Sequence, residues 1–223
     1  MSSSADPERT QLLRERELAF FGAVTASVSH DLNNTVATIE QTAGLLEDII
    51  LECAGSPTID KQQAGRIAER IGRQSQRGAE IIRRLRAFAH SVDDPEREIE
   101  LNEVVETVVA LARRMADRKR IALERRSGQE RLTIRNSAFR VQQALYISIQ
   151  EAVTIAPEGG TVTLGTMRRD STARICVEGA CDTPGGELDL PFLNILMGQI
   201  GGEIEASVKD SRACIQLVFR AAS

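Results

Sequence analysis

The chain has 223 residues, of which 28 are Lys or Arg and 32 are Asp or Glu, and its formal net charge at pH 7 is −4. Hydrophobic residues make up 42% and charged residues 27%, as in an average soluble globular protein, which excludes a strongly basic nucleic-acid binder and a disordered acidic tail. No apolar stretch approaches the roughly 18 residues of a membrane span and no signal peptide opens the chain, so we expect a cytoplasmic protein without a membrane or nucleic-acid partner.

Two long helical patterns occupy the N-terminal part of the chain. Apolar residues recur at three- and four-residue spacing over residues 7–51 without an internal break. Gly and Pro within residues 54–58 predict a turn, and a second apolar series follows over residues 64–89. The sequence therefore predicts an antiparallel helical hairpin.

Such a hairpin cannot enclose its own core, because each apolar stripe needs more partner surface than one other helix supplies. A homodimer that forms a four-helix bundle is the simplest solution. The two helical segments also differ in charge. Residues 61–90 include eight basic and two acidic residues, whereas residues 7–50 include three basic and seven acidic ones. The oppositely charged surfaces of the two segments are either simply solvated or form a docking surface for a partner.

The character of the sequence changes after the charged, proline-containing segment 93–98. This segment predicts a linker, which divides the chain into residues 1–94 and 95–223. Beyond it we expect strands near residues 99–101, 121–126, 132–135, 161–168, 173–177, 203–208 and 213–220, and helices near residues 102–118, 138–156 and 190–200. This mixed order predicts an α+β fold with helices on one face of the sheet.

The cysteines give no indication of a metal site. Cys53, Cys176, Cys181 and Cys214 show no C-x-x-C spacing and form no zinc pattern with the two histidines, His30 and His90. We therefore interpret the cysteines as small buried hydrophobic residues and expect no bound metal.

His30 is the candidate for histidine chemistry. At about 100° per residue, the side chains of His30, Asp31 and Asn34 fall together on the helix face away from the apolar stripe. Asp31 can accept a hydrogen bond from one ring nitrogen and fix the tautomer, which leaves the other nitrogen nucleophilic near pH 7. Asn34, one turn along, can hold a water or a phosphoryl oxygen beside that nitrogen. A surface histidine without function is the alternative interpretation.

Segment 27–34, SVSHDLNN, fits the pattern H-[DE]-x-x-[NT] and resembles the H-box of sensor histidine kinases. In that family, a His on the first helix of a dimeric four-helix bundle receives a phosphoryl group. The resemblance implies that His30 accepts phosphate, that Asp31 does general-base work and that Asn34 does phosphatase work. Thr35 stands where the family often has a kinking proline.

The second part of the chain resembles the ATP-binding domain of the same kinases, in the order of its elements and in segments 139–145, 156–162 and 199–204. The resemblance implies the fold but not the nucleotide chemistry. Glu151 stands where the family has the asparagine that holds Mg²⁺, and segment 179–183 lacks the aspartate that recognises adenine. Segment 187–190 puts two acidic residues where anionic phosphate would lie. We therefore expect no ATP binding and no cofactor.

Together these features resemble the dimeric histidine phosphotransferases built on a histidine-kinase fold. The resemblance implies reversible transfer of a phosphoryl group from a receiver-domain aspartate to His30, and onward to a second receiver. The partners would be receiver domains of response regulators or hybrid histidine kinases, which would carry the Mg²⁺ for the transfer. Three alternatives stay open: an autophosphorylating kinase with a divergent nucleotide site, a non-enzymatic adaptor or pseudokinase, and a phosphatase that acts on a response regulator.

Overall fold

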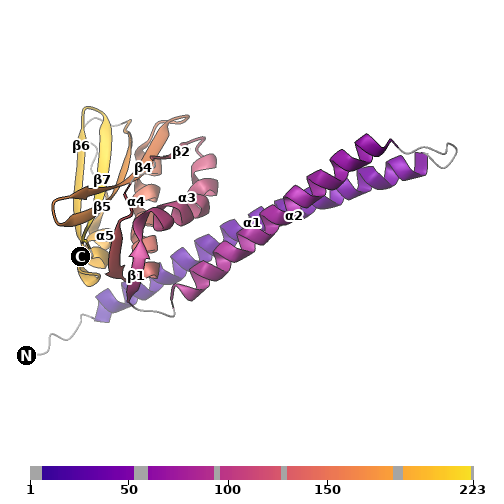
Figure 1. Ribbon diagram of the computed structural model, residues 1–223. Coiled ribbons are helices and arrows are strands. Elements are labelled where there is room, and N and C mark those ends of the chain that lie inside the picture. The colour runs from indigo at the N-terminus through magenta and orange to yellow at the C-terminus, as the bar shows by residue number, and fades with distance from the viewer. Residues whose placement is uncertain (1–6, 53–59, 93–95, 127–129, 183–187, 222–223) are drawn as a thin grey trace, which may run out of the picture. The chain divides into compact units, whose positions relative to one another are not determined.

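The computed structural model describes residues 7–52, 60–92, 96–126, 130–182 and 188–221 (Figure 1). Contacts divide the chain into two compact units. One unit is Thr25–Phe88, and the other joins Met1–Val24 to Ala89–Ser223. The turn expected at residues 54–58, the middle of the expected linker, Cys53 and Glu187 lie outside the described residues.

The unit of residues 25–88 consists of parts of two long helices, as the apolar spacing predicts. Helix α1 runs over Pro7–Glu52 and helix α2 over Lys61–His90. No helix in the described ranges is both long and apolar enough to cross a bilayer.

The two helices of this unit pack through a regular stripe. Val28, Thr35 and Thr42 recur every seven residues along α1, and all three are buried. Opposite them, Gly78 of α2 comes so near to α1 that a Cβ atom placed on it would lie 3.5 Å from Cγ2 of Thr35. A Cβ atom there would make an ordinary van der Waals contact, so Gly78 and Thr35 face each other at the middle of the hairpin.

The larger unit has a mixed sheet and three further helices. The helices are α3 (Leu101–Asp117), α4 (Ala138–Ile155) and α5 (Pro191–Gln199). The strands are β1 (Arg97–Glu100), β2 (Ala122–Arg125), β3 (Thr133–Asn136), β4 (Thr161–Arg169), β5 (Thr172–Ala180), β6 (Glu203–Lys209) and β7 (Arg212–Arg220). Five strands form one sheet in the order β2-β4-β5-β7-β6, and β1 pairs with β3. Strand β2 is parallel to β4, whereas the other neighbours are antiparallel.

The core of this unit lies between the sheet and its helices. Leu164, Ile175 and Leu217 point inward from neighbouring strands and are buried together with Leu145 and Ile149 of α4. Alternate residues on these strands form the other face, which is rich in polar and charged side chains. Figure 1 shows α3 and α4 on one side of the sheet. The α+β fold with helices on one face is therefore confirmed.

Element ends differ from the expectation where side chains cap a helix. The strand expected at residues 99–101 ends at Glu100, because the Glu100 carboxylate accepts hydrogen bonds from the backbone N–H groups of Asn102 and Glu103. Such an N-cap satisfies the first donors of a helix. Leu101 consequently begins α3 instead of ending β1.

The first part of α1 packs on α4 within the larger unit. Phe20 is 4% exposed, and its ring centroid lies 5.6 Å from that of Phe139 and 5.1 Å from that of Tyr146. One turn earlier, the Arg16 guanidinium lies 5.6 Å from the centre of the Phe192 ring on α5. Aromatic contacts of this kind join the beginning of the chain to a surface that follows more than a hundred residues later.

Candidate functional site

Helix α1 presents His30, Asp31 and Asn34 to solvent in the unit of residues 25–88. The side chain of His30 is 46% exposed and that of Asp31 is 41% exposed. Asn34 is also exposed. The helical spacing therefore places the three polar side chains as the sequence predicts, on a face that a partner can reach.

Both neighbours of the imidazole contact the same ring nitrogen. The Asn34 amide nitrogen lies 3.2 Å from Nδ1 of His30, and Oδ1 of Asp31 lies 3.7 Å from the same atom. The expected division, with Asp31 at one nitrogen and Asn34 beside the other, is not found. The reason is that the side-chain torsions of the three residues, which the helical spacing does not fix, turn both neighbours toward Nδ1. Within the described residues, no hydrogen bond to Nε2 is found.

The hydrogen bond at Nδ1 decides the chemistry of Nε2. With the amide nitrogen of Asn34 against it, Nδ1 accepts and the proton of a neutral ring sits on Nε2. A half-turn of the amide brings its oxygen to Nδ1, which then donates, and Nε2 keeps its lone pair. The carboxylate of Asp31 favours this second tautomer, because it can only accept. His30 can therefore offer a nucleophilic Nε2 while its ring is held.

Threonine hydroxyls support the backbone around these residues. Oγ1 of Thr35 donates to the carbonyl of Asp31 at 2.8 Å, and Oγ1 of Thr38 donates to the carbonyl of Asn34 at 2.8 Å. Each bond adds a second donor to a carbonyl that the helix already uses. Helix α1 continues through Thr35, at the position where a proline would have removed a backbone donor.

The line from Thr35 to Gly78 separates two sides of the hairpin. Each residue turns the side-chain direction by about 100° around its helix, and the two helices turn in opposite senses because they are antiparallel. Counted from the facing positions Thr35 and Gly78, the side chains of His30, Asp31 and Asn34 lie on one side of the hairpin, here called the histidine side. Val36 of α1 and Ile82 of α2 fall on the opposite, apolar side, and they are 49% and 54% exposed. The apolar side also carries Leu32, Ile39, Ile50, Ala68 and Ala79.

A pocket of about 290 Å³ lies in the larger unit where α1, α4 and α5 meet. It is lined by Ile147, Glu151 and Asp189, together with Arg16 and Phe20. The fold thus brings together two of the acidic positions that the sequence singled out, although they are far apart along the chain. Arg16 and Phe20 were not predicted there, because nothing in the local sequence relates the start of α1 to α4.

The surroundings of Glu151 in this pocket disfavour its ionised form. Burial raises the pKa of Glu151 above its ordinary value, and the nearby Asp189 carboxylate raises the pKa further. Arg16 and a backbone hydrogen bond at Asp189 act in the opposite direction. The raised pKa means that the folded chain disfavours the ionised form of Glu151.

The other motif positions give no ligand set. Cys181 is buried, and its backbone N–H donates to the carbonyl of Ser211, while that of Asp182 donates to the carbonyl of Ile155. Thr183 lies outside the described residues. Within the described ranges, no group of three or more His, Cys, Asp or Glu side chains is arranged to hold a metal ion.

Comparison with known proteins gives the fold. No protein-family model and no curated protein matches this chain. Among solved structures, the catalytic domain of histidine kinase ThkA is 17% identical at a TM-score of 0.50, over 57% of this chain and 98% of that chain. Histidine kinase ThkA in complex with the response regulator TrrA is 16% identical at a TM-score of 0.50, and the match covers 99% of this chain and 68% of that chain. A histidine kinase from Burkholderia phymatum is 15% identical at a TM-score of 0.50, and the match covers 85% of this chain and 99% of that chain. The expected histidine-kinase-like fold is therefore confirmed.

Proposed function

We propose that this chain, which has the fold of histidine kinases, is a cytoplasmic histidine phosphotransferase of a two-component phosphorelay. His30 takes a phosphoryl group from the aspartate of a receiver domain and passes it to the receiver of a response regulator. The observation that carries the proposal is the exposed His30 ring, whose Nδ1 lies beside Asn34 and Asp31 and whose Nε2 has no hydrogen-bond partner among the described residues. A likeness to a histidine kinase solved with a response regulator supports this class of partner.

The transfer needs one nucleophile and one leaving group. The lone pair of Nε2 attacks the phosphorus of the acyl phosphate, an N–P bond forms, and the P–O bond to the aspartate breaks. The aspartate leaves as a carboxylate, and the phosphorylated ring keeps its proton on Nδ1. The Asp31 carboxylate favours this protonated nitrogen by its charge, and the Asn34 amide accepts from it when the amide is turned to bring its oxygen to Nδ1. Mg²⁺ on the receiver supplies charge neutralisation when bound there, and His30 is aligned for an in-line attack.

The pocket of the larger unit supports a donor other than ATP. We infer that it does not hold a nucleoside triphosphate, because Glu151 and Asp189 would add negative charge beside the phosphates, with Arg16 as the cation of the lining. The raised pKa of Glu151 indicates that this place already disfavours its own negative charge. Phe20 and Arg16 fill one wall from α1. We therefore assign the larger unit to support and docking, with no cofactor.

The active species is a homodimer with a four-helix bundle. The apolar side of the hairpin supports this, because Val36 and Ile82 are about half exposed in a single chain. Pairing two such sides would remove these side chains from water, and burying one large aliphatic side chain contributes about 1.5–3 kcal/mol. The histidine side faces the other way and stays open to receivers.

The experiment is a transfer assay with purified components. Receiver domains are phosphorylated with acetyl phosphate, freed of the donor and mixed with the chain, and acid-labile phosphate on the chain is measured. We expect phosphate on the native protein and none on the His30→Ala variant. His90→Ala is the matched control, since it removes the other of the two histidines, and it should be labelled normally.

Each rival function gives a different result in the same assay. Label on His30 from ATP and Mg²⁺ alone would identify an autophosphorylating kinase. Loss of phosphate from the receiver without label on His30 would identify a phosphatase. Binding of a receiver without any movement of phosphate would identify an adaptor. Any of these three results contradicts the phosphotransferase proposal.

A further inference from the structure

Strand β6 is an edge of the five-stranded sheet (Figure 1). It pairs with β7 on one side, and among the described residues no strand pairs with its other side. An edge strand presents a row of backbone N–H and C=O groups to which another strand can bind. The open edge of β6 is therefore a surface that a further strand can extend.

The turn between β6 and β7 determines which backbone groups face the open edge. Asp210 and Ser211 have positive φ angles of 49° and 57°, as the two central residues of a type I′ turn do. In such a hairpin the flanking residues Lys209 and Arg212 exchange hydrogen bonds, and the bonded pairs then alternate along the strands. The N–H and C=O groups of three β6 residues consequently point to the open edge, namely Ile204, Ala206 and Val208.

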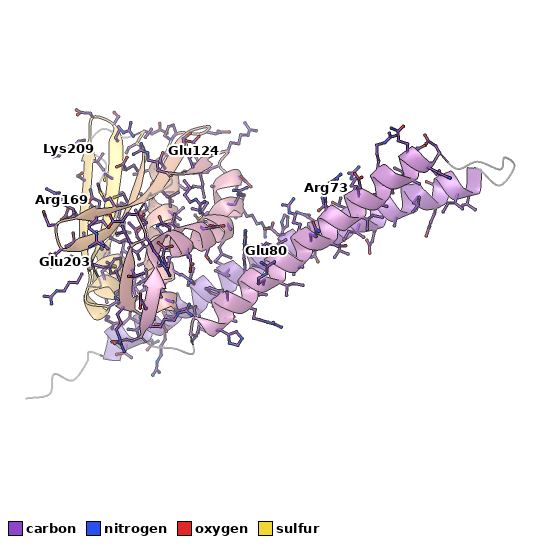
Figure 2. All side chains as sticks on the ribbon, in the orientation of Figure 1. Arg73, Glu80, Glu124, Arg169, Glu203 and Lys209 are labelled. Atoms are coloured by element: carbon purple, nitrogen blue, oxygen red, sulfur yellow. The ribbon has the colours of Figure 1, made fainter. Side chains whose placement is uncertain are left out.

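The side chains of β6 alternate between the two faces of the sheet. Ile204 and Val208 lie on the core side and are half-buried. Glu203 and Lys209 lie on the other face, at the two ends of the strand, and both are exposed (Figure 2). Neither of them forms an ion pair within the described ranges. A strand with opposite charges at its two ends is complementary to an antiparallel copy of itself.

We propose that β6 binds the β6 strand of a second copy of this chain, antiparallel to it and across a two-fold axis at Ala206. This inference goes beyond the proposed phosphotransferase function and does not depend on it. The pairing puts Ile204 opposite Val208 of the second copy, and Glu203 opposite its Lys209. All three open N–H groups of each strand find an acceptor, so the two sheets continue as one.

Charges and open backbone groups together select this register. Charged side chains normally protect an edge strand from pairing, because like charges directly opposite each other repel. An axis at Glu205 would put that carboxylate against its own copy. An axis at Ser207 would place Ile204 beyond the end of the second strand and leave its N–H without a partner. The axis at Ala206 uses the full strand and brings opposite charges together.

The remaining acidic residue of β6 is held within its own sheet. Arg174 of β5 donates hydrogen bonds to Glu205 and to Gln216 of β7. The side chain of Arg174 is only 8% exposed, so this contact is part of the folded sheet. In the proposed register Glu205 lies opposite Ser207 of the second copy, whose small side chain accommodates it. Glu203 is therefore the carboxylate available for the lysine of the second copy.

Sedimentation velocity of the full chain measures this association. The proposed hairpin dimer sets the mass at the lowest concentration, and we expect the mass to rise further with a dissociation constant of roughly 100 µM, because one strand pair is a small interface. Glu203→Lys and Lys209→Glu should each weaken this association about tenfold, since like charges then face each other at both ends. The two residues are roughly 20 Å apart along one strand, so they do not pair within a chain.

Mixing these two variants tests the register directly. In a mixed pair a lysine faces a glutamate at both ends, so the mixture should associate at least as tightly as the native chain at the same total concentration. The chain that carries both substitutions should also associate like the native chain. Glu124→Lys makes the same change of charge on β2, at the other edge of the sheet, and should leave the association within twofold of native.

Ala206→Pro tests the backbone pairing. The N–H of Ala206 points to the open edge, so proline removes a donor to the second copy and leaves the bonds to β7 in place. The association should be lost, while circular dichroism and the melting temperature stay close to those of the native chain.

Three outcomes would overturn the inference. They are a mass that stays constant up to about 0.5 mM, an association that survives both Ala206→Pro and Glu203→Lys, and a mixture of the two charge variants that associates no better than either alone. None of these measurements involves phosphate. Failure of transfer to His30 with charge-dependent association would defeat the proposed function alone, and normal transfer at a constant mass would defeat only the pairing of β6.

Discussion

The Phe20 ring of α1 lies 5.1 Å from the Tyr146 ring of α4, at an interplanar angle of 50°. Phe139, one turn before Gln143 on the same helix, has its ring centroid 5.6 Å from that of Phe20. Gln143 is itself fully buried, and its side-chain amide has no hydrogen-bond partner in the described residues. Aromatic contacts therefore hold the start of α1 to α4.

Phe20→Ala should destabilise the larger unit by about 3–5 kcal/mol, the range for removal of a buried aromatic side chain. The adjacent Phe21→Ala is the matched control, since the Phe21 side chain is 42% exposed and loses less burial. Thermal unfolding gives the stability, and hydrogen exchange of the α4 amides locates the change. Equal destabilisation by the two substitutions would contradict the assigned role of Phe20.

Glu151→Gln should raise the melting temperature at pH 7. The folded state raises the pKa of Glu151, so the stability that this carboxyl contributes is fully present below its ordinary value of 4.5 and is lost as pH rises through the folded-state value. The gain from Gln should therefore shrink as pH falls toward 4. Glu124→Gln, at an exposed position of β2, is the control. A gain that stays constant between pH 4 and 7 would exclude this cause.

Asn34→Ala should slow phosphate transfer to His30 about tenfold or more, because the ring loses a partner at Nδ1 and its orientation is less restricted. Asn34→Asp should restore transfer, since a carboxylate can only accept from Nδ1 and favours the nucleophilic Nε2. Nitrogen chemical shifts of the imidazole report the tautomer directly. Asn33→Ala, on the preceding residue, should leave both the rate of phosphate transfer and the imidazole chemical shifts unchanged.

Dephosphorylation separates two roles of the same residue. If Asn34→Ala abolished loss of phosphate from a receiver and left the labelling of His30 unchanged, Asn34 would position water and would not hold the ring. That result would contradict the role assigned to its contact with Nδ1.

Val36→Glu together with Ile82→Glu should convert the proposed dimer to a monomer, because both side chains lie on the apolar side and a buried pair of like charges is costly. Leu45→Glu is the matched control. Leu45 is 48% exposed, similar to Val36, but it falls on the histidine side. Sedimentation equilibrium gives the mass of each variant. Dimers that persist in the double variant, or that dissociate in the control, would place the interface elsewhere.

The sequence determined most of the local structure. Apolar spacing predicted α1 and α2 because a buried stripe repeats with the helical period, and Gly and Pro marked where the elements end. Helix α4 and the strands of the large sheet follow their predicted ranges to within a few residues, since alternation with turn residues specifies them locally. The motif around His30 and its exposed face could be predicted for the same reason.

Tertiary structure decided the relationships between distant positions. That Phe20 packs on Tyr146, and that Arg16 shares a pocket with Glu151, depends on long-range packing that no local pattern specifies. The common position of Asp31 and Asn34 at Nδ1 depends on side-chain torsions. The excess of basic residues in 61–90 was visible in the sequence, but the side of the hairpin on which each of them lies required the proximity of Gly78 to Thr35, because helical period alone fixes a face only relative to its own helix.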